Sequence, residues 1–330
     1  MSTDLERAGL GGRRLEPDGR EWLLTIDFEA FRADRLRPWL HAMRAWAREA
    51  RRHRMAFSTF IAVEDVDVLR LADPGAHASF MEGIAGLIDA GMEFHPHNHW
   101  VYDRDSGARR TPKPDRPVVP GYRKRMSFFH DAVHVNGVDL SDWMGTVLAA
   151  YREFMAEAGA APPPRPAFRA GGWDSGSSDD DLRTFVRALA DNGFAYDSSA
   201  ARADGAGNRT PYGRNAFELA PGLAEVAPVS HMNARAPALS RRTVRIAAEL
   251  LANPRLWAPP SRPGALVTVI HIDNVLHTGR GSRVRKWTVE DPETIERRVA
   301  SHFRQLAAIR RLLRLRCATF EDLRLRPAGG

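Results

Sequence analysis

The chain has 330 residues, 43% of them hydrophobic and 27% charged, and its 48 Lys and Arg against 41 Asp and Glu give a formal net charge of +7. A chain of this length and composition can bury a substantial core as a globular protein. Its single cysteine, Cys317, excludes an intrachain disulfide framework and a cysteine-rich metal site.

Charge and hydropathy also bear on partners and location. The positive residues are nearly all arginines and are spread through the chain, so we do not expect nucleic acid as a partner, and a polyanion is a minority interpretation. The first residues, MSTDLERAGLGGRR, lack the apolar core of a signal peptide. No apolar run reaches the roughly 20 residues that a membrane span needs. We therefore expect a cytoplasmic protein without a membrane span.

Predicted strands and helices alternate along most of the chain, which is typical of a parallel sheet or barrel. Residues 1–19 are polar and rich in Gly and Arg, and they predict a flexible arm. Residues 103–140, dense in Pro, Gly and charge, predict a long loop inserted on the functional face. The predicted strands are 22–26, 55–63, 92–94, 167–173, 194–196, 223–230 and 265–272, and the predicted helices are 34–52, 76–90, 141–159, 179–192, 240–253 and 292–315.

The first predicted strand ends on two carboxylates. In LLTIDFEAF (23–31), Asp27 and Glu29 stand on either side of Phe28. Burying an unpaired carboxylate is costly, and the carboxyl ends of strands are where α/β sheets and barrels build their sites. The acids therefore suggest a site, although the same pattern fits two exposed acids that cap the next helix.

Three histidines follow the third predicted strand. In EFHPHNHW (93–100), His95, His97 and His99 occupy alternate positions. Neutral imidazole is the commonest metal ligand, and two imidazoles with a carboxylate make the usual open site of a hydrolytic metal centre. His95 and His99 have the spacing of two ligands on one turn, whereas on an extended segment all three would share a face. A histidine-rich surface loop is the alternative, but three of 12 histidines within five residues favour a metal site.

Two later strand ends carry an arginine and a histidine. FRAGGW (168–173) places Arg169 before two glycines, where it is either a surface charge or a fixed cation that lowers the pKa of a neighbouring carboxylate. TVIHIDN (268–274) ends its apolar run on His271, which is either a satisfied core residue or a general acid or base. Asp273 would then orient its imidazole.

Taken in order, TIDFEAF, EFHPHNH, FRAGGW, GFAYDSS (193–199) and TVIHIDN resemble the motifs of the polysaccharide deacetylase family, the NodB-homology carbohydrate esterases. The resemblance implies an α/β fold, a distorted (β/α)7 barrel, as a single domain over residues 20–326 that contains the loop insertion at 103–140. It also implies a hydrolase that depends on a divalent metal, most often Zn2+. Such an enzyme removes acetyl groups, mostly N-acetyl, from a glycan or an amino-sugar-containing precursor.

The resemblance also implies roles for individual residues. Asp27 is the general base, Arg169 holds it, and His271, supported by Asp273, protonates the leaving amine. Glu29 and two of the three histidines bind the metal. His95 with His99 keeps the family's four-residue spacing. His97 is a competing choice, because its separation from Glu93 along the sequence also suits the family's first metal ligand. The residues expected to bind substrate are Trp100, Trp173, Tyr196 and Asp197.

Two departures from the family pattern leave alternatives open. The family commonly has adjacent acids in its first motif, whereas Phe28 follows Asp27 here, so Glu29 is the substitute and either acid could be the base. The family's Asp-Trp motif behind the late histidine has no counterpart, and Asp273 is assigned its role instead. The alternative functions are a catalytically silent carbohydrate-binding barrel and a related metal-dependent hydrolase of small amides.

Overall fold

The computed structural model describes residues 15–17, 21–28, 36–98, 129, 133–134, 137–171, 175–176, 178–199, 216–227, 230–233, 266–271 and 291–327. His271 is described by its backbone alone. Several sequence predictions fall outside these ranges: Glu29, His99, Trp100, Trp173, Asp273, the helix at 240–253 and most of the 103–140 insertion.

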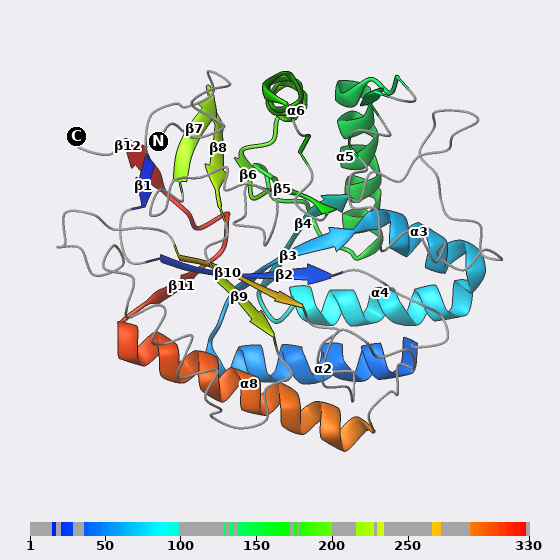
Figure 1. Ribbon diagram of the computed structural model, residues 1–330. Helices are drawn as coiled ribbons and strands as arrows, with labels where there is room; N and C mark the ends of the chain where they lie inside the picture. The colour runs from blue at the N-terminus through cyan, green and yellow to red at the C-terminus, as the bar shows by residue number, and fades with distance from the viewer. Residues whose placement is uncertain are drawn as a thin grey trace.

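Eight parallel strands follow one another in a single curled sheet, and helices pack on its outer side (Figure 1). The order is β8-β6-β5-β4-β3-β2-β10-β9, with β7 antiparallel to β8 at one edge and β11 parallel to the first residues of β2. The α/β class and barrel-like sheet predicted from the sequence are confirmed. The strands are β2 (Glu21–Phe28), β3 (Phe57–Ala62), β4 (Met92–Asn98), β5 (Ala167–Ala170), β6 (Tyr196–Asp197), β7 (Ala216–Ala220), β8 (Leu223–Val226), β9 (Ser230–Asn233), β10 (Leu266–His271) and β11 (Arg316–Ala318).

The two ends of the parallel run come close together through β8 and β9. These strands lie at opposite ends of the run, yet β8 ends at Val226 and β9 begins at Ser230. Consecutive Cα atoms are about 3.8 Å apart, so the four steps between these residues span at most about 15 Å. This run of the described sheet has eight parallel strands, one more than the seven that the sequence resemblance implies.

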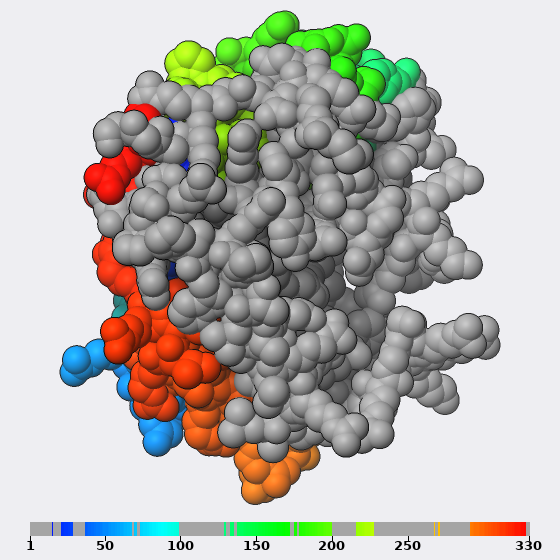
Figure 2. Space-filling view, turned by 60° about the vertical axis from the view of Figure 1, so that its left-hand side comes forward, coloured from blue at the N-terminus to red at the C-terminus, as the bar shows by residue number. Residues whose placement is uncertain are grey.

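Alternation along the strands separates two apolar layers. Along β2, Trp22, Leu24 and Ile26 face the helices, whereas Leu23 belongs to a smaller cluster on the inner side of the curled sheet that also contains Phe60. The helices α2 and α8 lie side by side on the lower surface, blue and orange-red in Figure 2. The helices are α2 (Leu36–His53), α3 (Val63–Ala72), α4 (Pro74–Ile88), α5 (Leu140–Glu157), α6 (Asp179–Asp191) and α8 (Pro292–Leu313).

Several observed elements were not predicted, among them one helix and two of the strands. Helix α3 starts directly after β3 without a separating turn, and its sequence VEDVDVLRLA mixes acids into the apolar positions, so it has no clear helical period. Strand β7 lies in a segment whose sequence predicts no strand. Strand β1 (Leu15–Pro17) belongs to the predicted N-terminal arm and pairs with β12 (Leu325–Pro327), which brings the two ends of the described chain together.

Glycine ends α4 as the sequence suggests. Gly91 has a φ of 84°, which favours glycine, and its N–H donates to the Ile88 carbonyl at 2.8 Å. Within the ranges described above, no helix is both long and apolar enough to cross a membrane.

We expect acid to destabilise the fold through His302, on the inner side of α8. Its ring lies 5.6 Å from that of Trp46 on α2, and burial lowers its pKa from 6.5 to about 4. Between these values the unfolded chain binds a proton that the folded chain does not, so the free energy of unfolding falls as the pH drops from 6.5 to 4. The loss from this residue is up to about 3 kcal/mol.

The measurement is urea unfolding at pH 7.5 and at pH 4.5 for the wild type and for His302→Phe, which cannot titrate. We expect the variant to lose less stability over this interval than the wild type. Equal losses in the two proteins would contradict the assignment. Comparing the two proteins cancels the contributions of His53 and His77, whose pKa values burial also lowers.

Candidate active site

A buried ion pair joins β2 and β5 inside the curled sheet. Arg169 is 0% exposed, and its Nη1 donates to Oδ1 of Asp27 at 2.5 Å. Its Nη2 donates to the hydroxyls of Thr25 (3.0 Å) and Ser198 (2.9 Å), and its Nε donates to the Ser198 carbonyl (3.2 Å). The guanidinium is therefore held from three sides, and Asp27, 6% exposed, compensates its buried charge.

An aromatic ring fixes the plane of the same guanidinium. The Cζ atom of Arg169 lies 4.1 Å from the ring centroid of Phe60, which is level with Asp27 in the β2–β3 register. A cation over an aromatic face is attracted by the ring quadrupole, and more strongly where water is excluded. The Phe60 ring also packs against His95, with centroids 5.5 Å apart. The Phe60 ring thus contacts both the guanidinium of Arg169 and the ring of His95.

His97 has the ring orientation of a metal ligand. It pairs with Arg169 in the β4–β5 register, and its Nδ1 lies 2.9 Å from the carbonyl oxygen of Arg169. A carbonyl only accepts hydrogen bonds, so Nδ1 carries the proton and the neutral ring has its lone pair on Nε2. Metal-binding histidines are commonly oriented in this way, by a carbonyl or carboxylate on the other nitrogen. The donor chemistry of His97 therefore fits a metal.

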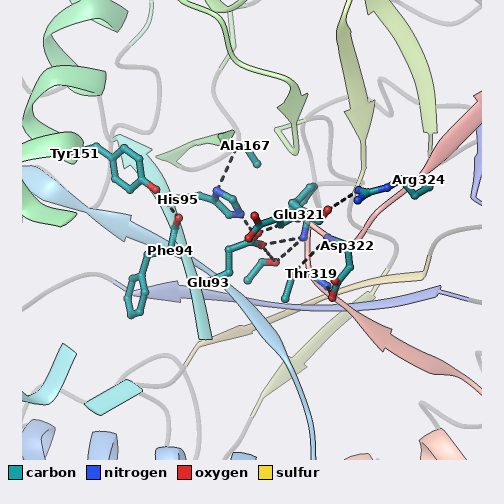
Figure 3. A network of polar contacts seen from close by, with 11 residues as sticks. Glu93, Phe94, His95, Tyr151, Ala167, Thr319, Glu321, Asp322 and Arg324 are labelled. Carbon is teal, nitrogen blue, oxygen red and sulfur yellow. Dashed lines mark hydrogen bonds and ion pairs between the residues drawn. The ribbon is translucent and has the colours of Figure 1, made fainter. Parts of the chain in front are cut away.

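His95 does not fit that role as it is placed. Its Nδ1 accepts from the N–H of Ala167 at 3.2 Å, so Nε2 carries the proton and donates to Oε2 of Glu93 at 2.8 Å (Figure 3). Both nitrogens are thus used by the protein, and the ring is 0% exposed. This geometry argues against His95 as a ligand, and with it against the His95–His99 pair. Strand β4 continues to Asn98, which leaves His95 deep in the sheet and not at its end.

Glu93 holds the C-terminal segment at Phe320 and Glu321 against strand β4 through hydrogen bonds (Figure 3). Its carboxylate accepts from Ser58 Oγ at 2.7 Å and from the N–H groups of Phe320 (2.9 Å) and Glu321 (2.8 Å), besides His95. Burial by itself would raise the pKa of Glu93, but the His95 ring and these hydrogen bonds outweigh it and lower the pKa. The role of Glu93 and His95 here is structural.

The described residues expected to bind substrate lie in the packed interior. Tyr196 is 5% exposed, and its hydroxyl donates to the Leu323 carbonyl at 3.2 Å. Asp197 is 3% exposed and accepts from Ser199 Oγ at 2.5 Å. Burial raises the pKa of Asp197, although hydrogen bonds with Glu225 and Ser199 act in the opposite direction. As placed, both side chains are buried and hydrogen-bonded to other groups of the protein.

Four residues with predicted roles lie near the carboxyl ends of β5, β4, β2 and β10. In addition to Asp27, Arg169 and His97, the backbone of His271 on β10 lies beside Asp27 of β2 in the parallel register. Glu29 and His99, each two residues beyond a member of this group, are outside the described residues. Among the described residues alone, no three His, Cys, Asp or Glu side chains gather into a possible metal site.

Sequence reasoning missed several residues that support the site. Thr25 could have been found, because it is two residues before Asp27 and so lies on the same face of the strand. Ser198 and Phe60 could not, since nothing near them in the sequence marks their contact with Arg169. Glu225 was marked by its position, as an acid within the apolar LAEV strand.

Comparison with known proteins gives distant structural likeness only. No protein-family model and no curated protein matches the sequence. A family 4 carbohydrate esterase from Streptomyces lividans is 13% identical, with a TM-score of 0.37 over 88% of this chain and 90% of that one. A peptidoglycan N-acetylglucosamine deacetylase is also 13% identical, with a TM-score of 0.42 over 93% and 89%. A CE4 family pseudoenzyme from Bacillus anthracis is 13% identical, with a TM-score of 0.40 over 93% and 66%. Likeness at this level says nothing about the reaction of this chain.

Proposed function

We propose that this protein is a metal-dependent hydrolase that removes N-acetyl groups from a glycan or an amino-sugar-containing precursor. The observation that supports it best is the buried pair of Asp27 on β2 and Arg169 on β5, together with His97, which lies beside Arg169 on β4. Metal-assisted amide hydrolysis can use a carboxylate as general base and an imidazole as metal ligand, and a fixed guanidinium would hold the carboxylate ionised and oriented. The sequence resemblance supplies the substrate class.

We assign the metal, with Zn2+ as the expected ion, to His97, His99 and Glu29. His99 follows His97 by two residues and Glu29 follows Asp27 by two, so in continuing strands each would share the face of its described neighbour. When bound there, a divalent ion supplies a water of lowered pKa and a positive charge for the acetyl oxygen. His95 is left out of this set because both of its ring nitrogens are engaged.

The remaining chemistry falls to protein side chains. Asp27 takes up the proton of the attacking water on its carboxylate, and Arg169 keeps that carboxylate in one orientation through Nη1. An amine is a poor leaving group until it is protonated, and His271, whose backbone lies beside Asp27, is assigned to give it the proton. Base and acid would thus act from adjacent strands, β2 and β10.

The function is tested by elemental analysis of the purified protein together with acetate release. N-acetylated chitooligosaccharides and small N-acetyl amides are offered with and without added zinc. We expect acetate from the oligosaccharides, only when metal is present. Oligosaccharide binding without acetate release would favour a silent carbohydrate-binding barrel, and turnover of the small amides alone would favour a different amide hydrolase.

We expect metal binding to distinguish the histidines. His97→Ala should reduce the bound zinc to below about a tenth of the wild-type content, because losing one ligand sharply weakens a three-ligand site. His95→Gln should keep the metal and lower the thermal stability, because it disturbs the contacts with Glu93 and Ala167. Plasma mass spectrometry after dialysis measures the zinc. Loss of metal in the His95 variant alone would reverse our choice of ligand.

A further inference from the structure

Four arginines line a groove on the outer side of the fold, between α2 and α4. Its volume is about 770 Å³, and Arg44, Arg48, Arg51 and Arg52 of α2 form one wall. The two helices run side by side below the sheet (Figure 1), and atoms of α2 reach the lower surface in Figure 2. We call this hollow the arginine groove.

The positive charge of the arginine groove is only partly compensated. Arg48 pairs with Glu296 of α8 at 3.1 Å, and both Arg48 (3.6 Å) and Arg52 (3.7 Å) approach the buried carboxylate of Glu49. Arg44 and Arg51 make no ion pair with any acid in the described part of the chain. Exposed arginines at a helix C-terminus also interact with the helix dipole, but that effect does not require a hollow between them.

Two glycines of α4 shape the opposite wall. A Cβ atom on Gly83 would lie 2.8 Å from the Cε atom of Met43, so Gly83 allows α2 and α4 to pack closely there. A Cβ atom on Gly86 would meet nothing within 4 Å, so the hollow is open at that residue. Glu82 is the one acid among the lining residues. The volume falls in the range of small-molecule sites, about 300–1,000 Å³.

We propose that the arginine groove binds a soluble phosphorylated small molecule. A phosphate group offers several acceptor oxygens and up to two negative charges, and the planar guanidinium fork matches it with paired hydrogen bonds. The site is separate from the one around Asp27. The face of α2 toward the sheet buries Trp39, Met43 and Trp46, whereas the groove lies on the exposed side of the helix. This proposal therefore does not depend on the hydrolase reaction.

The test is calorimetric titration of the full chain with inorganic pyrophosphate at constant ionic strength. We expect saturable binding to the wild type, and Gly86→Glu should weaken it by at least about tenfold, because it adds a negative charge among the lining residues at a position where a Cβ atom meets nothing within 4 Å. Gly86→Gln has the same size without the charge and should bind within about twofold of the wild type. A pyrophosphate bound at a metal near Asp27 would not respond to Gly86→Glu.

A second pair of variants covers the arginines themselves. Arg44→Ala with Arg51→Ala should also weaken binding by at least about tenfold, whereas Arg304→Ala, an exposed arginine of α8 outside the groove, should not. Circular dichroism checks that each variant is folded. The proposal is overturned if the wild type shows no saturable binding or if Gly86→Glu binds like the wild type. Binding to phosphatidylglycerol vesicles without binding to pyrophosphate would overturn it in favour of a membrane surface.

Discussion

Replacing Arg169 by methionine is expected to lower the free energy of unfolding by about 3–5 kcal/mol, the usual result of removing one partner from a buried ion pair. The variant keeps a long side chain over Phe60 but leaves the carboxylate of Asp27 buried without its counterion. It also removes the donors to Thr25 and Ser198. Urea unfolding at neutral pH measures the change.

A double-mutant cycle separates the ion pair from the other contacts of Arg169. Asp27→Asn combined with Arg169→Met removes both charges, so the double variant should be destabilised by less than the sum of the two single variants. A cost below about 1 kcal/mol for Arg169→Met, as is typical of a surface pair, would contradict the buried pairing. Strict additivity would show that Arg169 acts mainly through Thr25, Ser198 and Phe60.

Asp27→Asn is expected to reduce acetate release by about 10²- to 10⁴-fold, the usual contribution of a general base. Asparagine has nearly the same shape and can still accept from Arg169, but it cannot take up a proton from water. Zinc content should stay near that of the wild type, because Glu29, His97 and His99 are the assigned ligands. Initial rates on N-acetylated chitooligosaccharides and elemental analysis of the same sample provide the two measurements.

The outcome also decides between the two acids of the first strand. If Asp27→Asn loses the metal and Glu29→Gln keeps it, the assigned roles of Asp27 and Glu29 are reversed. If neither substitution changes the rate of a wild type that does release acetate, neither acid is the base. Glu29→Gln is the matched control, since it makes the same chemical change two residues away.

Much of the fold could be predicted because its signals are local. Strand β2 is mostly apolar from Trp22 to Ile26, and the predicted strands alternate with predicted helices along the chain, so the α/β class follows from the sequence pattern. Helix α3 escaped prediction because its acids break that period, and the pairing of β1 with β12 joins residues near the two ends of the chain, such as Leu15 and Pro327. Nothing local in the sequence marks such a pairing.

The candidate site was predicted less completely. The contact of Asp27 with Arg169 links residues 142 apart, and its expectation came from the family resemblance alone. The roles of Asp27, Arg169 and His97 remain predictions that the experiments above test, and the role of His271 remains a prediction. The assignment of His95 met a specific obstacle, because its spacing from His99 is correct while its ring nitrogens are already engaged.

The sequence by itself determined most of the alternation of strands and helices along the chain. It also placed acids and imidazoles close to predicted strand ends. Both properties depend on side-chain type and on spacing along the chain. Only the tertiary structure decided which groups contact the ring nitrogens of each histidine. These contacts depend on which groups the neighbouring strands present: the β5 carbonyl of Arg169 lies against His97, whereas Glu93 and the N–H of Ala167 lie against His95. Pairing between strands sets these neighbours, and no local pattern records it.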